Sequence, residues 1–199
     1  MKKYIGSLLV VFSLVLLVGQ PLHAAPPVWQ IDKVHSGFFF DSKHIFSTVR
    51  GYFEDFSGEF RFSADNLAES TINFKVKVKS ILTNSPKRDQ HLRSPDFFDE
   101  KKYPYMTFTS SKITHDGGDK YSVAGTMTIK DVSTDFVLPM TYHGEKTNPS
   151  NPKQIVAGFN AELTINRLAY HVGDGRFYEM GLIQKEVDIT ISLEMIRNK

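Results

Sequence analysis

TINFKVKVK, residues 71–79, is the stretch that decides the fold class, because apolar and polar side chains alternate through it without a break. One face of an extended chain would carry its apolar side chains, those of Ile72, Phe74, Val76 and Val78. The other face would carry an asparagine and the lysines. Alternation with a period of two predicts a β-strand that buries one face and exposes the other to water.

The same alternation recurs along the chain, at residues 121–130, 134–144, 155–166 and 186–195. Weaker strand patterns cover residues 28–41, 45–54, 57–65 and 104–114. Short turn signals such as Asp116-Gly117-Gly118 separate them and favour antiparallel neighbours. These patterns predict an all-β fold of about eight strands, either a sandwich or a barrel. We favour an extended antiparallel β-barrel, because only the strand that contains Pro139 resembles a protected edge.

Two segments depart from the strand pattern. Residues 88–104, RDQHLRSPDFFDEKKYP, are crowded with charges, and Pro86 and Ser94-Pro95 each offer the start of a helix. We therefore predict one or two short helices around residues 86–100, with Phe97 and Phe98 docking them on the barrel. The second departure is the Gly-rich and aromatic-rich loop 171–181, just before the last strand.

The N-terminus has the features of a secretory signal peptide. Lys2 and Lys3 precede an apolar run at residues 8–18 that is too short to span a bilayer comfortably. We expect residues 1–24 to be removed after Ala24, although cleavage one residue later is also compatible with the sequence. The mature chain, residues 25–199, would then be one periplasmic or secreted domain with no integral membrane segment.

Charge and cysteine content exclude several functions. Removal of Lys2 and Lys3 lowers the count of Lys and Arg from 24 to 22, which equals the 22 Asp and Glu. A neutral chain argues against a nucleic-acid partner, which would require a basic surplus. With Cys 0, the chain has no disulfide, thiol chemistry or lipoprotein anchor. The sequence leaves open whether the chain forms a homodimer.

No catalytic or metal motif stands out. The histidines after residue 24 are His35, His44, His91, His115, His143 and His171, and none belongs to a motif such as HExxH. Asp89, His91 and Ser94 are the residue types of a hydrolase triad, but the sequence contains no GxSxG motif. We therefore predict no catalytic residue, no metal site and no enzyme activity.

Several blocks resemble the YceI-like family of lipocalin-like proteins. They are DKVHSGFFFDSKHIFSTVRGYFEDFSGEF (32–60), RDQHLRSPDFFD (88–99), KYPYMTFTSSKI (102–113), GTMTIKDVSTDFVLP (125–139) and QKEVDITISLE (184–194). The resemblance implies a lipocalin-like barrel whose long hydrophobic lumen holds an amphiphile, such as a polyisoprenoid, an isoprenoid quinone or a fatty-acid derivative. It also implies a periplasmic or secreted protein that is not an enzyme. No cofactor is expected apart from the bound lipid.

Apolar residues that point inward are the candidates for lining this lumen: Phe38, Phe40, Phe74, Val76, Met106, Phe108, Met127, Phe136, Met140, Phe159 and Ile189. In a small barrel such residues often simply fill the interior. A polar head group would need donors or cations at a mouth, and the candidates are His44, Arg50, Arg88, His91, Asn166, Arg167 and Arg176. The expanded loop VGDGRFYEMG, residues 172–181, departs from the family pattern, which bears on ligand identity more than on fold.

These observations predict a periplasmic carrier that sequesters a long-chain isoprenoid-type amphiphile, either a polyprenyl compound or an isoprenoid quinone. Two other readings remain compatible with the sequence. The first is a hydrolase that acts on a lipid-like ester or amide. The second is a structural or stress-related periplasmic barrel without a ligand.

Overall fold

The computed structural model describes residues 24–199, so the predicted signal peptide lies outside the described residues except for Ala24. The strands are β1 Val28–Ile31, β2 Gly37–His44, β3 Ser47–Phe53, β4 Phe56–Arg61, β5 Thr71–Lys77, β6 Ile81–Leu82, β7 Tyr105–Gly117, β8 Lys120–Ile129, β9 Val132–Thr147, β10 Gln154–Asn166 and β11 Ile183–Asn198. The short helices are η1 Val78–Ser80, α1 Pro86–Arg93, η2 Arg167–Tyr170 and α2 Arg176–Glu179. None of the helices in this part of the chain is long and apolar enough to cross a membrane.

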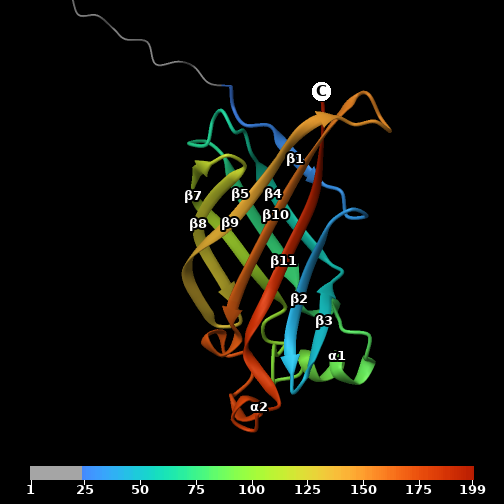
Figure 1. The fold of residues 1–199 in the computed structure, drawn as a ribbon, viewed down its shortest axis with the longest axis vertical. Helices are drawn as coiled ribbons and strands as arrows, with labels where there is room; N and C mark the ends of the chain where they lie inside the picture. Colours follow the sequence, from blue (N-terminus) through green and yellow to red (C-terminus); the bar gives the residue numbers. More distant parts are fainter. Residues whose placement is uncertain (1–23) are drawn as a thin grey trace, which may run out of the picture.

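The strands of residues 24–199 form one closed antiparallel β-barrel, which confirms the predicted fold class (Figure 1). β1 and β2 act as one interrupted strand, because both pair with β11. β3 with β4, and β5 with β6, form two more interrupted strands beside it. Together with β7 to β11 they make an eight-stranded barrel in which sequence neighbours are spatial neighbours. The ring closes where the last strand, β11, pairs with β1 and β2.

The first three strands of the barrel are broken at residues 32–36, 54–55 and 78–80. Main-chain hydrogen bonds continue across the breaks, for example from Lys77 N to Asp55 O at 2.9 Å. The predictions of continuous strands over 28–41 and 71–79 were therefore wrong in detail. Local interruptions of this kind are typical of barrel walls, whose strands must bend to close the ring.

Aromatic side chains fill the end of the barrel that contains β1 and the C-terminus. We call this set the aromatic cluster; it consists of Trp29, Phe60, Phe62, Tyr121, Tyr142 and Phe159. The ring centroids of Phe62 and Phe159 are 5.2 Å apart in an edge-on contact, and Tyr142 stacks on Phe159 at 5.0 Å. The Trp29 indole donates to Phe62 O at 3.0 Å, so its buried polar atom is satisfied. This end is therefore closed by packing.

Loops and short helices cover the opposite end, which is the lower end in Figure 1. A second hydrophobic set, here called the lower cluster, joins them to the barrel; it consists of Phe97, Ile129, Tyr170 and Val172. α1 begins at Pro86, as predicted, but hydrogen-bonded turns follow it where a second helix was considered. Asp99 interrupts that segment with a φ of 51°. The second α-helix, α2, lies instead within the 171–181 loop.

The wall is incomplete between β9 and β10 at the lower end. Their pairing runs only from Ile155↔Thr147 to Asn160↔Thr141, although both strands continue beyond it. η2 bridges this part of the wall, where the Tyr170 hydroxyl lies 2.9 Å from Thr134 Oγ1. Tyr170 also belongs to the lower cluster, so the bridge is packed as well as hydrogen-bonded.

Candidate functional site

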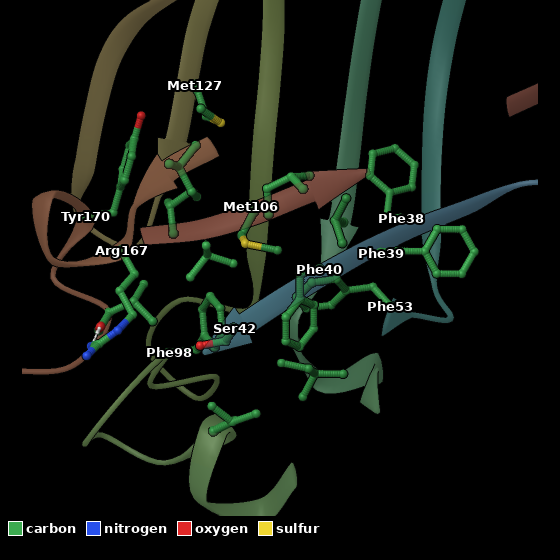
Figure 2. Close-up of a pocket in the computed structure, with 18 of the residues that line it drawn as sticks. Phe38, Phe39, Phe40, Ser42, Phe53, Phe98, Met106, Met127, Arg167 and Tyr170 are labelled. Atoms are coloured by element: carbon green, nitrogen blue, oxygen red, sulfur yellow. Dashed lines mark hydrogen bonds between the residues drawn. The ribbon is translucent and has the colours of Figure 1, made fainter. Parts of the chain in front are cut away.

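A cavity of about 190 Å³ lies inside the lower half of the barrel (Figure 2). The residues of the lower cluster line one end of it, and the barrel strands supply its walls. The wall residues of each strand alternate with outward-facing ones, which is why a period of two in the sequence produces an apolar interior. Phe38 and Phe40 face inward in this way, whereas Phe39 between them is 39% exposed, although it also borders the cavity.

The cavity is elongated along the strands. On β11 the lining extends from Ile183 to Ile191, which corresponds to roughly 26 Å of extended chain. The wall is almost wholly apolar, and Met106 and Met127 contribute sulfur atoms to it (Figure 2). Its shape and chemistry suit a chain-like apolar guest.

Most of the residues expected to line the lumen surround this cavity, namely Phe38, Phe40, Phe74, Val76, Met106, Phe108, Met127, Phe136 and Ile189. Met140 and Phe159 do not. They face the interior as expected, with exposures of 5% and 2%, but they lie in its packed part, where Phe159 contacts Trp29 and Phe62. Alternation identifies the inward face of a strand, but it does not indicate how deep the empty part of the barrel reaches.

Other cavity-lining residues had not been proposed from the sequence, including Phe53, Phe98, Leu163, Tyr170 and Val187. Leu163 and Val187 lie on the inward face of clearly alternating strands, so the pattern contained enough information to propose them. Phe53, on β3, lies next to a break in its strand and has a weaker pattern. Phe98 and Tyr170 lie outside the strands, where periodicity offers no signal.

Arg167 is a buried cation at the lower end of the cavity. Its side chain is 5% exposed, and it donates from Nη1 to Val172 O at 2.7 Å and from Nε to Gln184 O at 2.9 Å. A longer bond of 3.4 Å runs from Nη2 to Ile183 O. Desolvation lowers the pKa of the Arg167 guanidinium, and the nearby Asp174 carboxylate partly opposes this shift. The acceptors are main-chain carbonyls, so the geometry orients the cation without neutralising it.

His44 and Arg88 mark the place where the cavity reaches the surface. Both side chains are exposed, and both line the cavity. Arg88 Nε donates to Thr83 Oγ1 at 2.7 Å, and the Thr83 hydroxyl in turn donates to the buried Asp89 carboxylate. α1 is thus held at the mouth by a polar network, which places one cation at the opening and leaves Arg167 deeper inside.

Arg50 and Asn166 have other partners and do not line the cavity. Arg50 forms a two-point ion pair with Asp41 on the outside of hairpin β2–β3, with a closest N···O distance of 2.6 Å. This hydrogen-bonded pair lowers the pKa of the Asp41 carboxyl. Asn166 accepts a hydrogen bond from Leu168 N at 3.0 Å and so caps η2.

His91 and Arg176 converge on Asp96 instead of the cavity. His91 Nε2 and Arg176 Nη2 each lie 2.9 Å from Asp96 Oδ2. The hydrogen bond from His91, followed by the charge of Arg176, lowers the pKa of the Asp96 carboxyl. This cluster connects the segment after α1 to α2, which is a structural role at the lower end of the barrel.

The hydrolase constellation drawn from the sequence is not assembled. Asp89 pairs with Thr83, and the His91 ring pairs with Asp96. The Ser94 hydroxyl donates to the His91 carbonyl at 2.7 Å, not to its ring. These contacts give Ser94 no general base among the residues of the proposed triad.

Within residues 24–199, one cluster of potential metal ligands comes together in space. Asp32, His35 and Glu194 bring their ligand atoms within 4.8 Å of one another on the barrel surface. A hydrogen bond to Asp32 is the main cause of the raised pKa of His35, and their closest N···O distance is 2.9 Å. This pair lies in the break between β1 and β2, and exposed acidic groups of this kind are common without a metal.

Comparisons with known proteins agree with this architecture. Protein YceI of Escherichia coli O157:H7 is 34% identical over 174 residues, which cover 86% of this chain and 87% of that protein. The crystal structure of BcnA from Burkholderia cenocepacia is similar with a TM-score of 0.74 and 27% identity, covering 84% of this chain and 99% of that chain.

A polyisoprenoid binding domain from Saccharophagus degradans, implicated in plant cell wall breakdown, is also similar in structure. The TM-score is 0.62 over 84% of this chain and 97% of that chain, with 14% identity, so this likeness concerns the fold. The YceI-like domain itself matches residues 29–195, which include nearly the whole barrel. The chain therefore belongs to the YceI-like family.

Proposed function

We propose that the protein is a periplasmic carrier that buries the tail of a long-chain isoprenoid-type amphiphile in its lumen. The observation that carries this proposal is the elongated apolar cavity, closed by packing at the aromatic cluster and reaching the surface beside His44 and Arg88. The expected signal peptide supports the periplasmic location. The structural likeness to a domain described as polyisoprenoid binding supports the class of ligand.

The tail would bind through the hydrophobic effect. Burial of each CH₂ group contributes about 0.8 kcal/mol, so even part of a long tail would be held tightly. The cavity of 190 Å³ exceeds the size that binds benzene in an engineered protein core, roughly 150 Å³. A longer tail would require the lining to move, and Met106 and Met127 have the flexible side chains for such a change.

The head group would lie at the lower end, near the cations. Arg167 is buried there without a carboxylate as hydrogen-bond acceptor, and Arg88 and His44 lie at the mouth. A buried guanidinium favours an oxygen acceptor such as a phosphate or a quinone carbonyl. Both polyprenyl phosphates and isoprenoid quinones present such oxygens at one end of an apolar chain.

Native mass spectrometry followed by solvent extraction tests the proposal. We expect the purified protein to carry an amphiphile, and the same compound to appear in the organic extract. Protein that has been unfolded in denaturant, stripped of lipid and refolded serves as the control, and it should regain the adduct when a polyprenyl phosphate or a quinone is added. A protein that releases nothing and takes up neither compound would exclude the carrier function.

A further inference from the structure

The tip of hairpin β2–β3 exposes two large apolar side chains to solvent. Ile45 and Phe46 form the two-residue turn between the paired residues His44 and Ser47. Phe46 is fully exposed, at 102% of its reference area, and Ile45 is 51% exposed. A single exposed apolar residue needs no explanation, but here two neighbours form the most projecting part of a hairpin.

The residues of this turn are unfavourable for its backbone conformation. Ile45 has a φ of 52°, a left-handed conformation that favours glycine or asparagine in two-residue hairpin turns. A β-branched residue is strained in this region, and neither side chain of the tip is buried in the core. These two residues weaken the turn and expose apolar area without stabilising the fold. They therefore indicate that the tip has a function other than a structural one.

The tip projects from the rim of the cavity mouth. His44, which directly precedes it, lines the cavity, and so does Ile183, which pairs with His44. Ile45 N donates to Leu182 O at 3.0 Å, so the tip lies beside the segment that follows α2. Met180 in that segment is 67% exposed. Figure 1 shows the hairpin reaching the same lower end of the barrel as α1 and α2.

We propose that this end of the protein docks on a lipid bilayer, with Ile45 and Phe46 inserted among the acyl chains and the cavity mouth facing the membrane. The proposal rests on the proposed function, because a membrane is where a carrier would collect or release such a ligand. A stable protein–protein interface buries about 800 Å² on each partner, which two projecting side chains do not supply. Interfacial insertion requires only such a shallow apolar element.

Apolar insertion, not attraction of charges, would drive this docking. Two cations near the tip are paired with carboxylates, Arg50 with Asp41 at 2.6 Å and Lys185 with Glu186 at 3.7 Å. Lys43, two residues before the tip, donates instead to the Thr48 hydroxyl at 2.8 Å. We therefore expect binding to vesicles of phosphatidylcholine as well as to vesicles that contain phosphatidylglycerol. For the same reason, added salt should weaken binding little.

Vesicle flotation of the purified protein and its variants tests the proposal. Replacing both tip residues, Ile45→Ser with Phe46→Ser, should lower the vesicle-bound fraction by about tenfold or more, because the inserted apolar area is lost. Val34→Ser is the matched control, since Val34 is 86% exposed but lies in the connection between β1 and β2, away from the lower end (Figure 1). All variants share one N-terminus, so any contribution from residues 1–24 cancels.

Ile45→Asn separates membrane docking from a structural role of the tip. Asparagine suits the left-handed conformation, so this variant should keep or raise the melting temperature while it lowers vesicle binding. Equal vesicle binding by the wild type and the double variant would overturn the proposal, as would a wild type that does not bind vesicles at all. Solvent extraction of the same preparations distinguishes membrane docking from the carrier function. Protein that carries lipid but does not bind vesicles would refute docking and leave the carrier function intact. Protein that binds vesicles but takes up no lipid would refute the carrier function.

Discussion

At the scale of single residues, the buried cation Arg167 depends on a glycine. A Cβ atom at position 173 would lie 2.4 Å from Arg167 Nη1, and Gly173 has a φ of 88°. Both facts favour glycine there, because it needs no side-chain volume and accepts the left-handed conformation. The 171–181 loop therefore contains one position that allows the guanidinium to reach the carbonyls at the end of the cavity.

Comparison of Gly173→Ala with Gly175→Ala should reveal this contact. Gly175 has a similar φ of 92°, but its nearest neighbour would be Leu168 Cδ1 at 3.9 Å. Both variants should lose about 1–2 kcal/mol through the left-handed backbone. Gly173→Ala should lose a further 1–3 kcal/mol or so, the usual cost of overpacking. Free energies of unfolding from denaturant titration measure the difference, and equal losses in the two variants would disprove the steric dependence.

At the scale of elements, the segment after α1 is held on the barrel by packing and by one lysine. Phe97 is 3% exposed and stacks on Phe177 of α2 with ring centroids 5.7 Å apart. Lys130, in the turn between β8 and β9, donates from Nζ to Phe97 O at 2.6 Å and also to His171 O. Desolvation lowers the pKa of Lys130, as expected for a cation that is held among carbonyls. The lower end is therefore one packed unit built from distant segments.

Replacement of Phe97 by alanine should cost about 3–5 kcal/mol of unfolding free energy, the usual range for a buried aromatic ring. Phe98 is only partly buried and faces the cavity, so Phe98→Ala should cost less. Phe46→Ala is the control, because its fully exposed ring should change stability by less than about 0.5 kcal/mol. Melting curves for Phe97→Ala and Phe46→Ala that coincide would show that Phe97 does not dock this segment.

At the scale of the whole molecule, the barrel could be predicted because most of its long strands repeat the period-two pattern of residues 71–79. The breaks in the first strands could not be predicted, because they depend on hydrogen bonds to residues far along the chain, such as Asp32 N to Glu194 O. The second helix falls in the 171–181 loop, where the glycines and the short length of α2 give no helical periodicity.

The site was predictable to a similar degree. Inward-facing positions could be identified, but the boundary between the packed end and the cavity depends on how side chains from all strands fill the interior. Met140 and Phe159 illustrate this limit. The sequence did not show which cations lie at the cavity and which pair with carboxylates. Arg50 and Arg176 form ion pairs with acidic residues only in the folded barrel, whereas Arg167 donates hydrogen bonds to main-chain carbonyls.

The claim that the lumen holds the ligand is tested most directly by lipid loading of Val76→Trp beside Val137→Trp. Val76 is 3% exposed and lines the cavity, whereas Val137 on β9 is 57% exposed. The same substitution therefore places an indole ring in the lumen in one variant and on the outer surface of the barrel in the other. With melting curves that show both variants folded, native mass spectrometry should find much less bound amphiphile in Val76→Trp and wild-type loading in Val137→Trp. Wild-type loading in Val76→Trp would contradict binding in the lumen.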